Sequence, residues 1–347
     1  MHFNVVKLEK RLEKLEFLLK STNDIDRKIE LTRDIRSLKI MIAYASGTKK
    51  IVVNDEGIFD DSVHKKNVEL VNFFNKYAFK IYKSLYCYSL GRRLPWRLIW
   101  DTKINDKEYF KLIESFLKEY DEKLLELYMH LKRSERIELC PRGYITNEDA
   151  LGLNVHLTTL NESYVLSRWN NKISSASILP HELGHAFLMN DTYSTESLVY
   201  KNGTIFSEAY SIFLEIIFLD YLRNNGYSKN SIREEYSKLD SFLALADYHH
   251  GSILKLENLS ICGDDLCTKD GNMGEVYTTK LILSNILGMY LADLYRNDRK
   301  KFMKEISCFF EMFGQSSEED MIKHFDLDTM VEGSRHVMNR YIKNYRK

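Results

Sequence analysis

The chain has 347 residues, of which 44% are hydrophobic and 29% charged. A chain of this length and composition folds as one large or two ordinary globular domains with a sizeable core, which excludes a disordered protein. Lys and Arg together number 50, as do Asp and Glu, so the formal net charge is +0. This balance gives no general attraction to nucleic acid or to an anionic membrane, and we expect neither as a partner.

The cysteines and the apolar runs bear on the compartment in which the chain works. The five cysteines are scattered and odd in number, so they do not predict a disulfide framework. The first residues carry charges where a signal peptide needs an apolar stretch. The longest apolar run, residues 212–219, contains Glu215 and is far shorter than the roughly 20 residues that span a bilayer. We therefore expect a cytoplasmic protein.

Two helices are predicted at the start of the chain. Apolar residues recur at helical spacing over residues 8–19 and again over 25–38, with a polar break at 21–24. Residues 1–60 are thus expected to hold a helical hairpin that ends near Gly47. The apolar side of this hairpin either packs on the rest of the chain, which is the simpler interpretation, or pairs with a partner as a coiled coil.

The rest of the chain, residues 61–347, is predicted to be mainly helical and to form one continuous structural unit with the hairpin. Only 3 Pro and 15 Gly occur in the chain, and so few breakers favour long helices. The predicted helices span 63–88, 106–120, 122–134, 205–224, 230–246, 276–295 and 299–313, with a last pair after Ser316. Short strands are predicted at 136–139, 153–159 and 163–169.

The sequence H-E-L-G-H occupies positions 181–185, directly after these strands. Ser177 is a good N-cap and Pro180 falls in the first turn, so a helix is expected here. Residues four apart lie on one helix face, so His181 and His185 can both point an imidazole at one metal ion. Glu182 cannot comfortably bind the same ion, but it can reach a water on it and act as a base.

The H-E-x-x-H pattern alone also fits a surface helix with two unrelated histidines, so a third ligand is needed. Glu208, on the next predicted helix, can complete a His₂Glu set for zinc. Glu215 lies two turns further along the same face and is a candidate to orient an imidazole N–H. It is otherwise an ordinary helix-surface acid, although its apolar neighbours would make an unpaired charge costly.

Residues 163–215 resemble the oligoendopeptidase F and thimet oligopeptidase family of zinc metallopeptidases. The shared pattern is a short strand, a turn, the zinc helix and a later Glu-x-x-Ser-x-x-x-Glu helix, here Glu208, Ser211 and Glu215. The resemblance implies a zincin-like helical metallopeptidase core, with Glu208 as third zinc ligand and Glu182 as general base. Weaker similarity extends from about residue 85 to the end. Family members are usually longer, with a larger N-terminal helical lobe.

The family also has a His and several tyrosines on a late helix that bind substrate and stabilise the oxyanion. By resemblance Tyr277 takes the tyrosine role, although it also fits a core aromatic. The family's His has no clear counterpart. His249 or His250 could replace it, and both equally fit loop histidines. His156 lies in a predicted strand and is better explained as structural, and the serines at 174–177 are better explained by capping than as nucleophiles.

Together these features predict a zinc metalloendopeptidase that holds one Zn²⁺ ion and hydrolyses internal bonds of peptides. The strand at 163–169 is expected to offer an edge on which an extended peptide pairs its backbone, which favours broad specificity. Two alternatives remain open: a protease dedicated to one protein substrate, and a non-catalytic zinc- or peptide-binding protein on the same scaffold. The sequence does not predict an oligomeric state.

Overall fold

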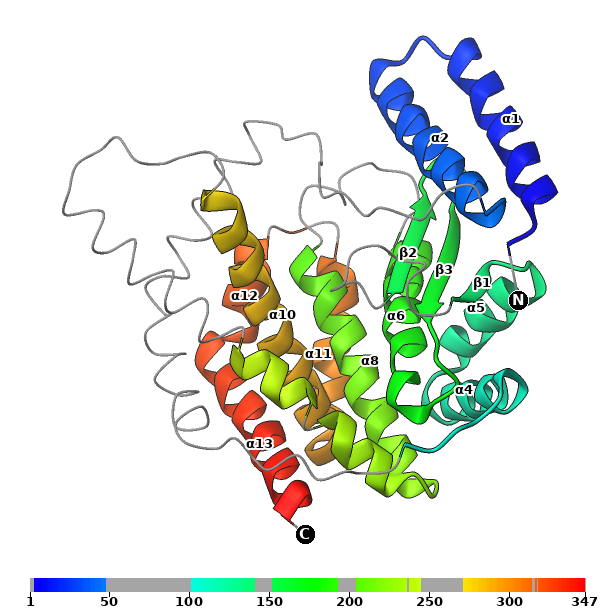
Figure 1. Ribbon diagram of the computed structural model, residues 1–347. Coiled ribbons are helices and arrows are strands. Elements are labelled where there is room, and N and C mark those ends of the chain that lie inside the picture. The colour runs from blue at the N-terminus through cyan, green and yellow to red at the C-terminus, as the bar shows by residue number, and fades with distance from the viewer. Residues whose placement is uncertain are drawn as a thin grey trace. The chain divides into compact units, whose positions relative to one another are not determined.

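The computed structural model describes residues 3–47, 101–140, 152–192, 204–235, 237–244, 271–313, 316 and 318–346 (Figure 1). The chain groups into two compact units. The first comprises residues 1–55 and 101–196, and the second comprises 56–100 and 197–347. The predicted helix at 63–88 and the predicted boundary near residue 60 lie outside the described residues, so the proposed domain division stays a prediction.

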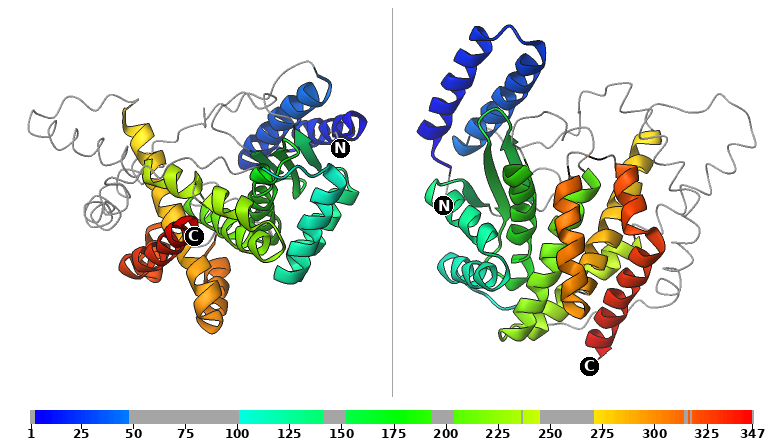
Figure 2. Two further views of the ribbon diagram at one scale, coloured as in Figure 1. Left: turned by 60° about the horizontal axis from the view of Figure 1, so that its bottom comes forward. Right: turned by 180° about the vertical axis from the view of Figure 1, so that it is seen from behind.

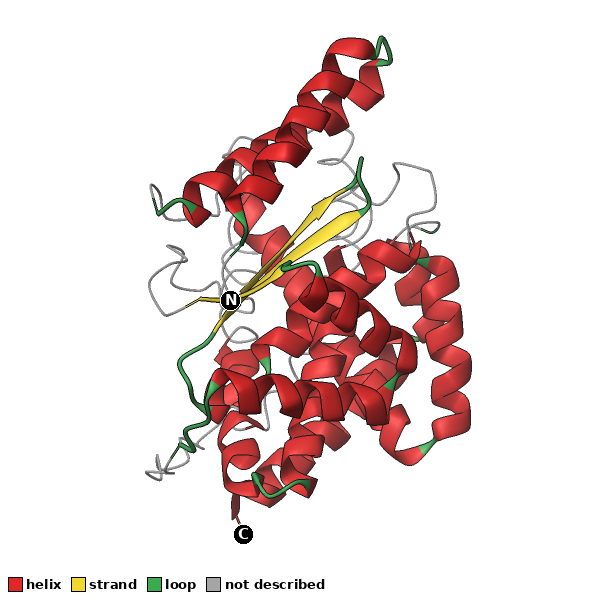
Figure 3. Ribbon diagram, turned by 90° about the vertical axis from the view of Figure 1, so that its right-hand side faces the viewer, coloured by secondary structure: helices red, strands yellow, loops and turns green. Residues whose placement is uncertain are grey.

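The described elements agree with the expected fold class, which is mainly helical with a small sheet (Figure 3). In the first unit they are α1 (Val5–Ser21), α2 (Ile25–Ala45), α4 (Asp106–Tyr120), α5 (Glu122–Arg133), β1 (Ile137–Cys140), β2 (Gly152–Leu157), β3 (Glu162–Arg168), a 3₁₀ turn (Ile173–Ser175) and α6 (Ile178–Thr192). In the second unit they are α8 (Thr204–Asn224), helical turns over 228–235 and 237–244, α10 (Gly271–Asn297), α11 (Arg299–Met312), α12 (Glu318–Phe325) and α13 (Leu327–Arg346).

The sheet of the first unit has three strands in the order β1-β3-β2. β3 pairs in parallel with β1 and antiparallel with β2, so that Gly152 lies opposite Ser167. The prediction that residues 163–169 offer a free strand edge is therefore wrong. Both sides of β3 are taken, one of them by a strand that begins 25 residues earlier in the chain, and within the described residues β1 and β2 are the outer strands.

The two faces of this sheet are covered by different helices. One face carries Leu157, Tyr164 and Leu166, which share a core with the apolar sides of α1 and α2. Neighbouring residues on a strand point to opposite faces, so Ser163 and Val165 face the other way, and there α6 packs on β2 and β3. The hairpin thus packs on the rest of the chain, as the simpler interpretation of the sequence had it.

Buried polar contacts tie the hairpin to the sheet. Glu138 on β1 accepts hydrogen bonds from the backbone N–H of Phe3 (2.9 Å) and from the hydroxyl of Tyr44 (3.0 Å). Asp34 on α2 accepts one from the backbone N–H of Thr159 in the β2–β3 turn (2.9 Å). Burial raises the pKa of the Asp34 carboxyl, while its bonds to Thr159 act in the opposite direction. These bonds fix the hairpin against the back of the sheet.

In the second unit, α10 packs against both α8 and α13 (Figure 2). α8 is apolar on most of its sides, and its Phe206, Phe213 and Phe218 are fully buried. Gly288 allows α10 to approach α8 closely, because a Cβ there would lie 2.7 Å from the carbonyl oxygen of Ala209. None of the described helices combines the length and apolar character that crossing a bilayer requires.

Candidate metal centre

The segment between β3 and α6 is held in place by α4. The indole of Trp169 stacks on the ring of Tyr109 with centroids 3.9 Å apart, and its Nε1–H donates to Asp106 (2.8 Å). The Tyr109 hydroxyl donates to the carbonyl oxygen of Ala176 (2.9 Å). Because Tyr109 is fully buried, this bond fixes the backbone just before α6 begins.

The serines before α6 are engaged in the same turn. The Ser174 backbone N–H and hydroxyl donate to the two carboxylate oxygens of Asp101 (3.2 and 2.5 Å), and the Ser175 hydroxyl donates to Asn170 (2.8 Å). These contacts agree with a role in turn formation. α6 then begins at Ile178, directly after Ser177, which is where the predicted N-cap placed it.

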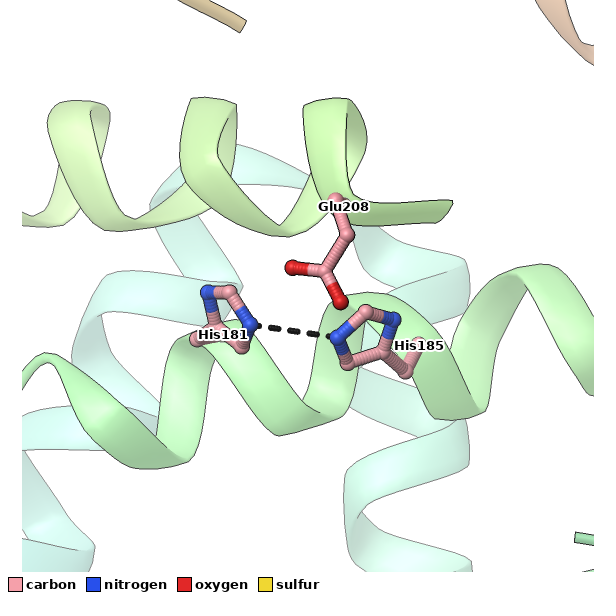
Figure 4. Close-up of side chains that lie close together, drawn as sticks. All are labelled: His181, His185 and Glu208. Carbon is pink, nitrogen blue, oxygen red and sulfur yellow. Dashed lines mark hydrogen bonds between the residues drawn. The ribbon is translucent and has the colours of Figure 1, made fainter. Parts of the chain in front are cut away.

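The two imidazoles of α6 face each other. Nε2 of His181 and Nε2 of His185 lie 3.1 Å apart, and both side chains are half-buried (Figure 4). Two ligand atoms on a tetrahedral zinc ion are separated by about 3.3 Å, given Zn–N distances of about 2.0–2.1 Å. The separation therefore suits two nitrogens that bind one ion. In that case each imidazole is neutral and carries its proton on Nδ1.

Glu208, the fifth residue of α8, completes the group. The candidate ligand atoms of His181, His185 and Glu208 all lie within 4.8 Å of one another, and Figure 4 shows the three side chains pointing toward a common point. Two imidazole nitrogens and one carboxylate oxygen form the donor set of several catalytic zinc sites, which leave a fourth position to water. The residues therefore fit a zinc ion, and their role as ligands stays a prediction.

The side chain of Glu182 points from α6 toward the sheet. This side chain is 6% exposed and lies against the backbone of Gly152, the first residue of the outer strand β2. No local pattern in the sequence indicates that these two residues are neighbours. The role of Glu182 as a general base is not tested by its position alone.

Glu215 is buried two turns further along α8 than Glu208 and forms an ion pair with Lys238 (2.7 Å). The expected cost of a charge among apolar side chains is thus reduced by a lysine from the following helical segment. The proposed contact with an imidazole stays a prediction. Lys238 could not be identified from the sequence, because nothing near it in the chain marks it as a partner.

Of the remaining candidate site residues, the structure describes only some side chains. Tyr277 lies within α10, but its side chain lies outside the described residues, as do His249 and His250. His156 is buried in β2, its Nδ1 lies 2.9 Å from the Ser163 hydroxyl, and burial lowers its pKa to about 4. This neutral, buried histidine agrees with the structural role expected for it.

No protein-family model matches the chain, and no curated protein matches it by sequence. Several solved structures match its fold. One is described as "a putative oligoendopeptidase F from Bacillus anthracis str. Ames", with 14% identity, a TM-score of 0.55, and coverage of 92% of this chain and 64% of that one. A "putative peptidase from Chlamydophila abortus" has 13% identity, a TM-score of 0.54, and coverage of 98% and 62%.

A third structure, described as "PZ peptidase A with inhibitor 2", has 12% identity, a TM-score of 0.52, and coverage of 92% and 66%. The chain thus spans slightly less than two thirds of each of these proteins. At such identities the likeness establishes the fold, and it confirms the helical peptidase-type architecture expected from the sequence.

Proposed function

We propose that the chain is a zinc-dependent metalloendopeptidase of the oligoendopeptidase F type, which hydrolyses internal bonds of peptides. The observation that carries this proposal is the group formed by His181, His185 and Glu208, with Glu182 beside the first ligand. The fold shared with oligoendopeptidase F structures supports it.

The first element of the mechanism is the metal. His181, His185 and Glu208 would hold one zinc ion and leave a position open to water. A bound zinc ion supplies Lewis-acid chemistry, because it lowers the pKa of its water toward about 7 and polarises a carbonyl group.

Glu182 supplies the proton transfer. Its carboxylate accepts a proton from the attacking water and then donates it to the amine that leaves when the peptide bond breaks. Its burial keeps competing solvent away from the carboxylate. By resemblance to the family, the Tyr277 hydroxyl would stabilise the oxyanion and His250 would contact the substrate. Glu215 would keep the imidazoles oriented.

The substrate is expected to lie along β2. In the part of the chain that the structure describes, β2 is an outer strand of the sheet and lies beside Glu182, so an extended peptide can add its backbone there. Such pairing involves main-chain atoms and therefore favours broad sequence specificity. A peptide library cut at a single sharply defined sequence would contradict this part of the proposal.

The decisive experiment compares the parent protein with Glu182→Gln on a mixed set of quenched fluorescent peptides, with the zinc content of both measured. The substitution keeps the size of the side chain and removes the base. We expect one zinc per chain in both proteins, cleavage by the parent, and a rate lower by about 10²- to 10⁴-fold in the variant. Glu332→Gln, which changes an exposed glutamate on α13, serves as the matched control and should cleave like the parent.

Two outcomes would point elsewhere. If the parent holds zinc but cleaves no peptide, the chain is either a protease for one protein substrate or a binding protein. If His181→Ala and His185→Ala keep the parent's zinc content, the proposed ligand set is wrong.

A further inference from the structure

The backbone dihedral angles of Gly152 do not require a glycine. The residue begins β2 and pairs with Ser167 of β3, and within the described residues the glycines with a positive φ are Gly47 and Gly226. An L-amino acid could adopt this conformation without strain. The reason for the missing side chain must therefore be sought in what surrounds the residue.

The three heavy atoms nearest to where a Cβ would stand all belong to one side chain. A Cβ on Gly152 would lie 2.7 Å from Cγ and 2.8 Å from Cδ of Glu182, and closer still to Oε1. These three atoms are the nearest neighbours of that position. Real Cβ atoms do not approach heavy atoms this closely, so any other residue at 152 would displace the Glu182 side chain.

From this contact we infer that Gly152 is the positioning residue for the carboxylate of Glu182. The inference rests on the proposed function, because it assigns Gly152 a task in the same reaction. The Glu182 side chain lies between the backbone of Gly152, which contacts it directly, and the α6 helix that carries it. Together they restrict a side chain with three rotatable bonds to the place from which it serves as base.

The steric conflict in a Gly152→Ala variant can be relieved by a movement of the Glu182 side chain. The atoms in conflict are Cγ, Cδ and Oε1 of that side chain and not atoms of a helix or strand backbone. The glutamate can rotate away while β2 and α6 keep their places. The fold should therefore tolerate the substitution, whereas the chemistry should not, because a displacement of about 1 Å at a reacting group can lower a rate by about 10²-fold.

The first test is kinetic. For Gly152→Ala we expect kcat to fall by about 10- to 100-fold, with KM within about threefold of the parent and unchanged zinc content. Gly333→Ala is the matched control, since its added Cβ would also be crowded (2.8 Å) but by the ring of Tyr290 on α10. This control should keep the parent's kcat, so that crowding as such is separated from displacement of the base.

A double-mutant comparison then shows whether Gly152 acts through Glu182. In a Glu182→Gln background, where the base is already absent, Gly152→Ala should lower the residual rate no further. Glu182→Asp shortens the side chain by one methylene group, so adding Gly152→Ala to it should cost clearly less than in the parent. An equal loss in all three backgrounds would overturn the inference and indicate that residue 152 contacts the substrate.

The second test does not depend on activity. Crystal structures of the zinc-loaded parent and of Gly152→Ala should show the Glu182 carboxylate displaced by about 1 Å or more, with both imidazoles in place. If the carboxylate keeps its position, the inference is wrong even when peptide cleavage is established. If it moves but the parent cleaves no peptide, the contact stands and the proposed function fails.

Discussion

His156 makes the stability of the first unit dependent on pH. The imidazole is buried in β2, and its Nδ1 lies 2.9 Å from the Ser163 hydroxyl. That hydroxyl also accepts a hydrogen bond from Asn190 (2.8 Å), so its own proton is left to donate to Nδ1. Protonation of His156 would place a hydrogen on Nδ1, so Nδ1 could no longer accept the hydrogen bond from Ser163. It would also put a positive charge in a buried position. Burial accordingly lowers the pKa of His156 to about 4.

The size of the effect follows from this shift. In the unfolded chain the pKa of the histidine is 6.5, so on acidification the unfolded state takes up a proton before the folded state does. The stability supplied by the neutral His156 is thus present above pH 6.5 and is lost as the pH falls toward 4. The full loss is about 3 kcal/mol, and about 2 kcal/mol of it is reached at pH 5.

The assay is urea unfolding of the zinc-loaded protein at pH 7.5 and pH 5.0, for the parent and for His156→Gln. Glutamine retains a polar side chain that does not titrate, so the part of the pH dependence that belongs to residue 156 disappears. We expect the parent to lose about 2 kcal/mol more than the variant between these pH values. Equal losses in the two proteins would refute the argument and show that His156 is protonated in the folded state.

Two further predictions concern the packing of each unit. Tyr44→Phe removes a buried donor from the Glu138 carboxylate and should lower the free energy of unfolding by about 1.5–3 kcal/mol in thermal or urea unfolding. An unchanged stability would show that other donors satisfy Glu138. Gly288→Ala places a Cβ against the carbonyl oxygen of Ala209, a backbone atom that cannot rotate away. A loss of about 1–3 kcal/mol is expected. Because Ala209 follows Glu208, a weaker affinity for zinc should accompany it, and unchanged zinc affinity would count against this coupling.

The sequence predicted well what depends on neighbours along the chain. The bounds of α4 were predicted from its apolar period, and the structure adds a capping box in which Asn105 and Glu108 cap each other's backbone. His181 and His185 are brought together by helix geometry alone, so their proximity could be predicted from their spacing. Glu208 was placed by resemblance to a family, since helical spacing does not say which later helix returns to the site.

What depends on residues far apart in the chain was harder to predict. The strand at 163–169 was located correctly, but its central place in the sheet depends on pairing with β1 and β2, which no local pattern specifies. The partner of Glu215, Lys238, comes from a separate helical segment. Gly152 has ordinary backbone angles, so only the position of Glu182 in space shows why a side chain is absent there.

The bond between Phe3 and Glu138 has a consequence for the order in which the chain can fold. The two residues are separated by 135 positions. At a synthesis rate of about 5–20 residues per second, Ala45, the last residue of α2, is made about 5–19 seconds before Glu138. During that interval the α1–α2 pair is complete, but the leucines that later contact the sheet remain open to water. Nascent chains of this protein therefore carry an exposed apolar surface that a chaperone can bind, and it closes only when the strands have been made.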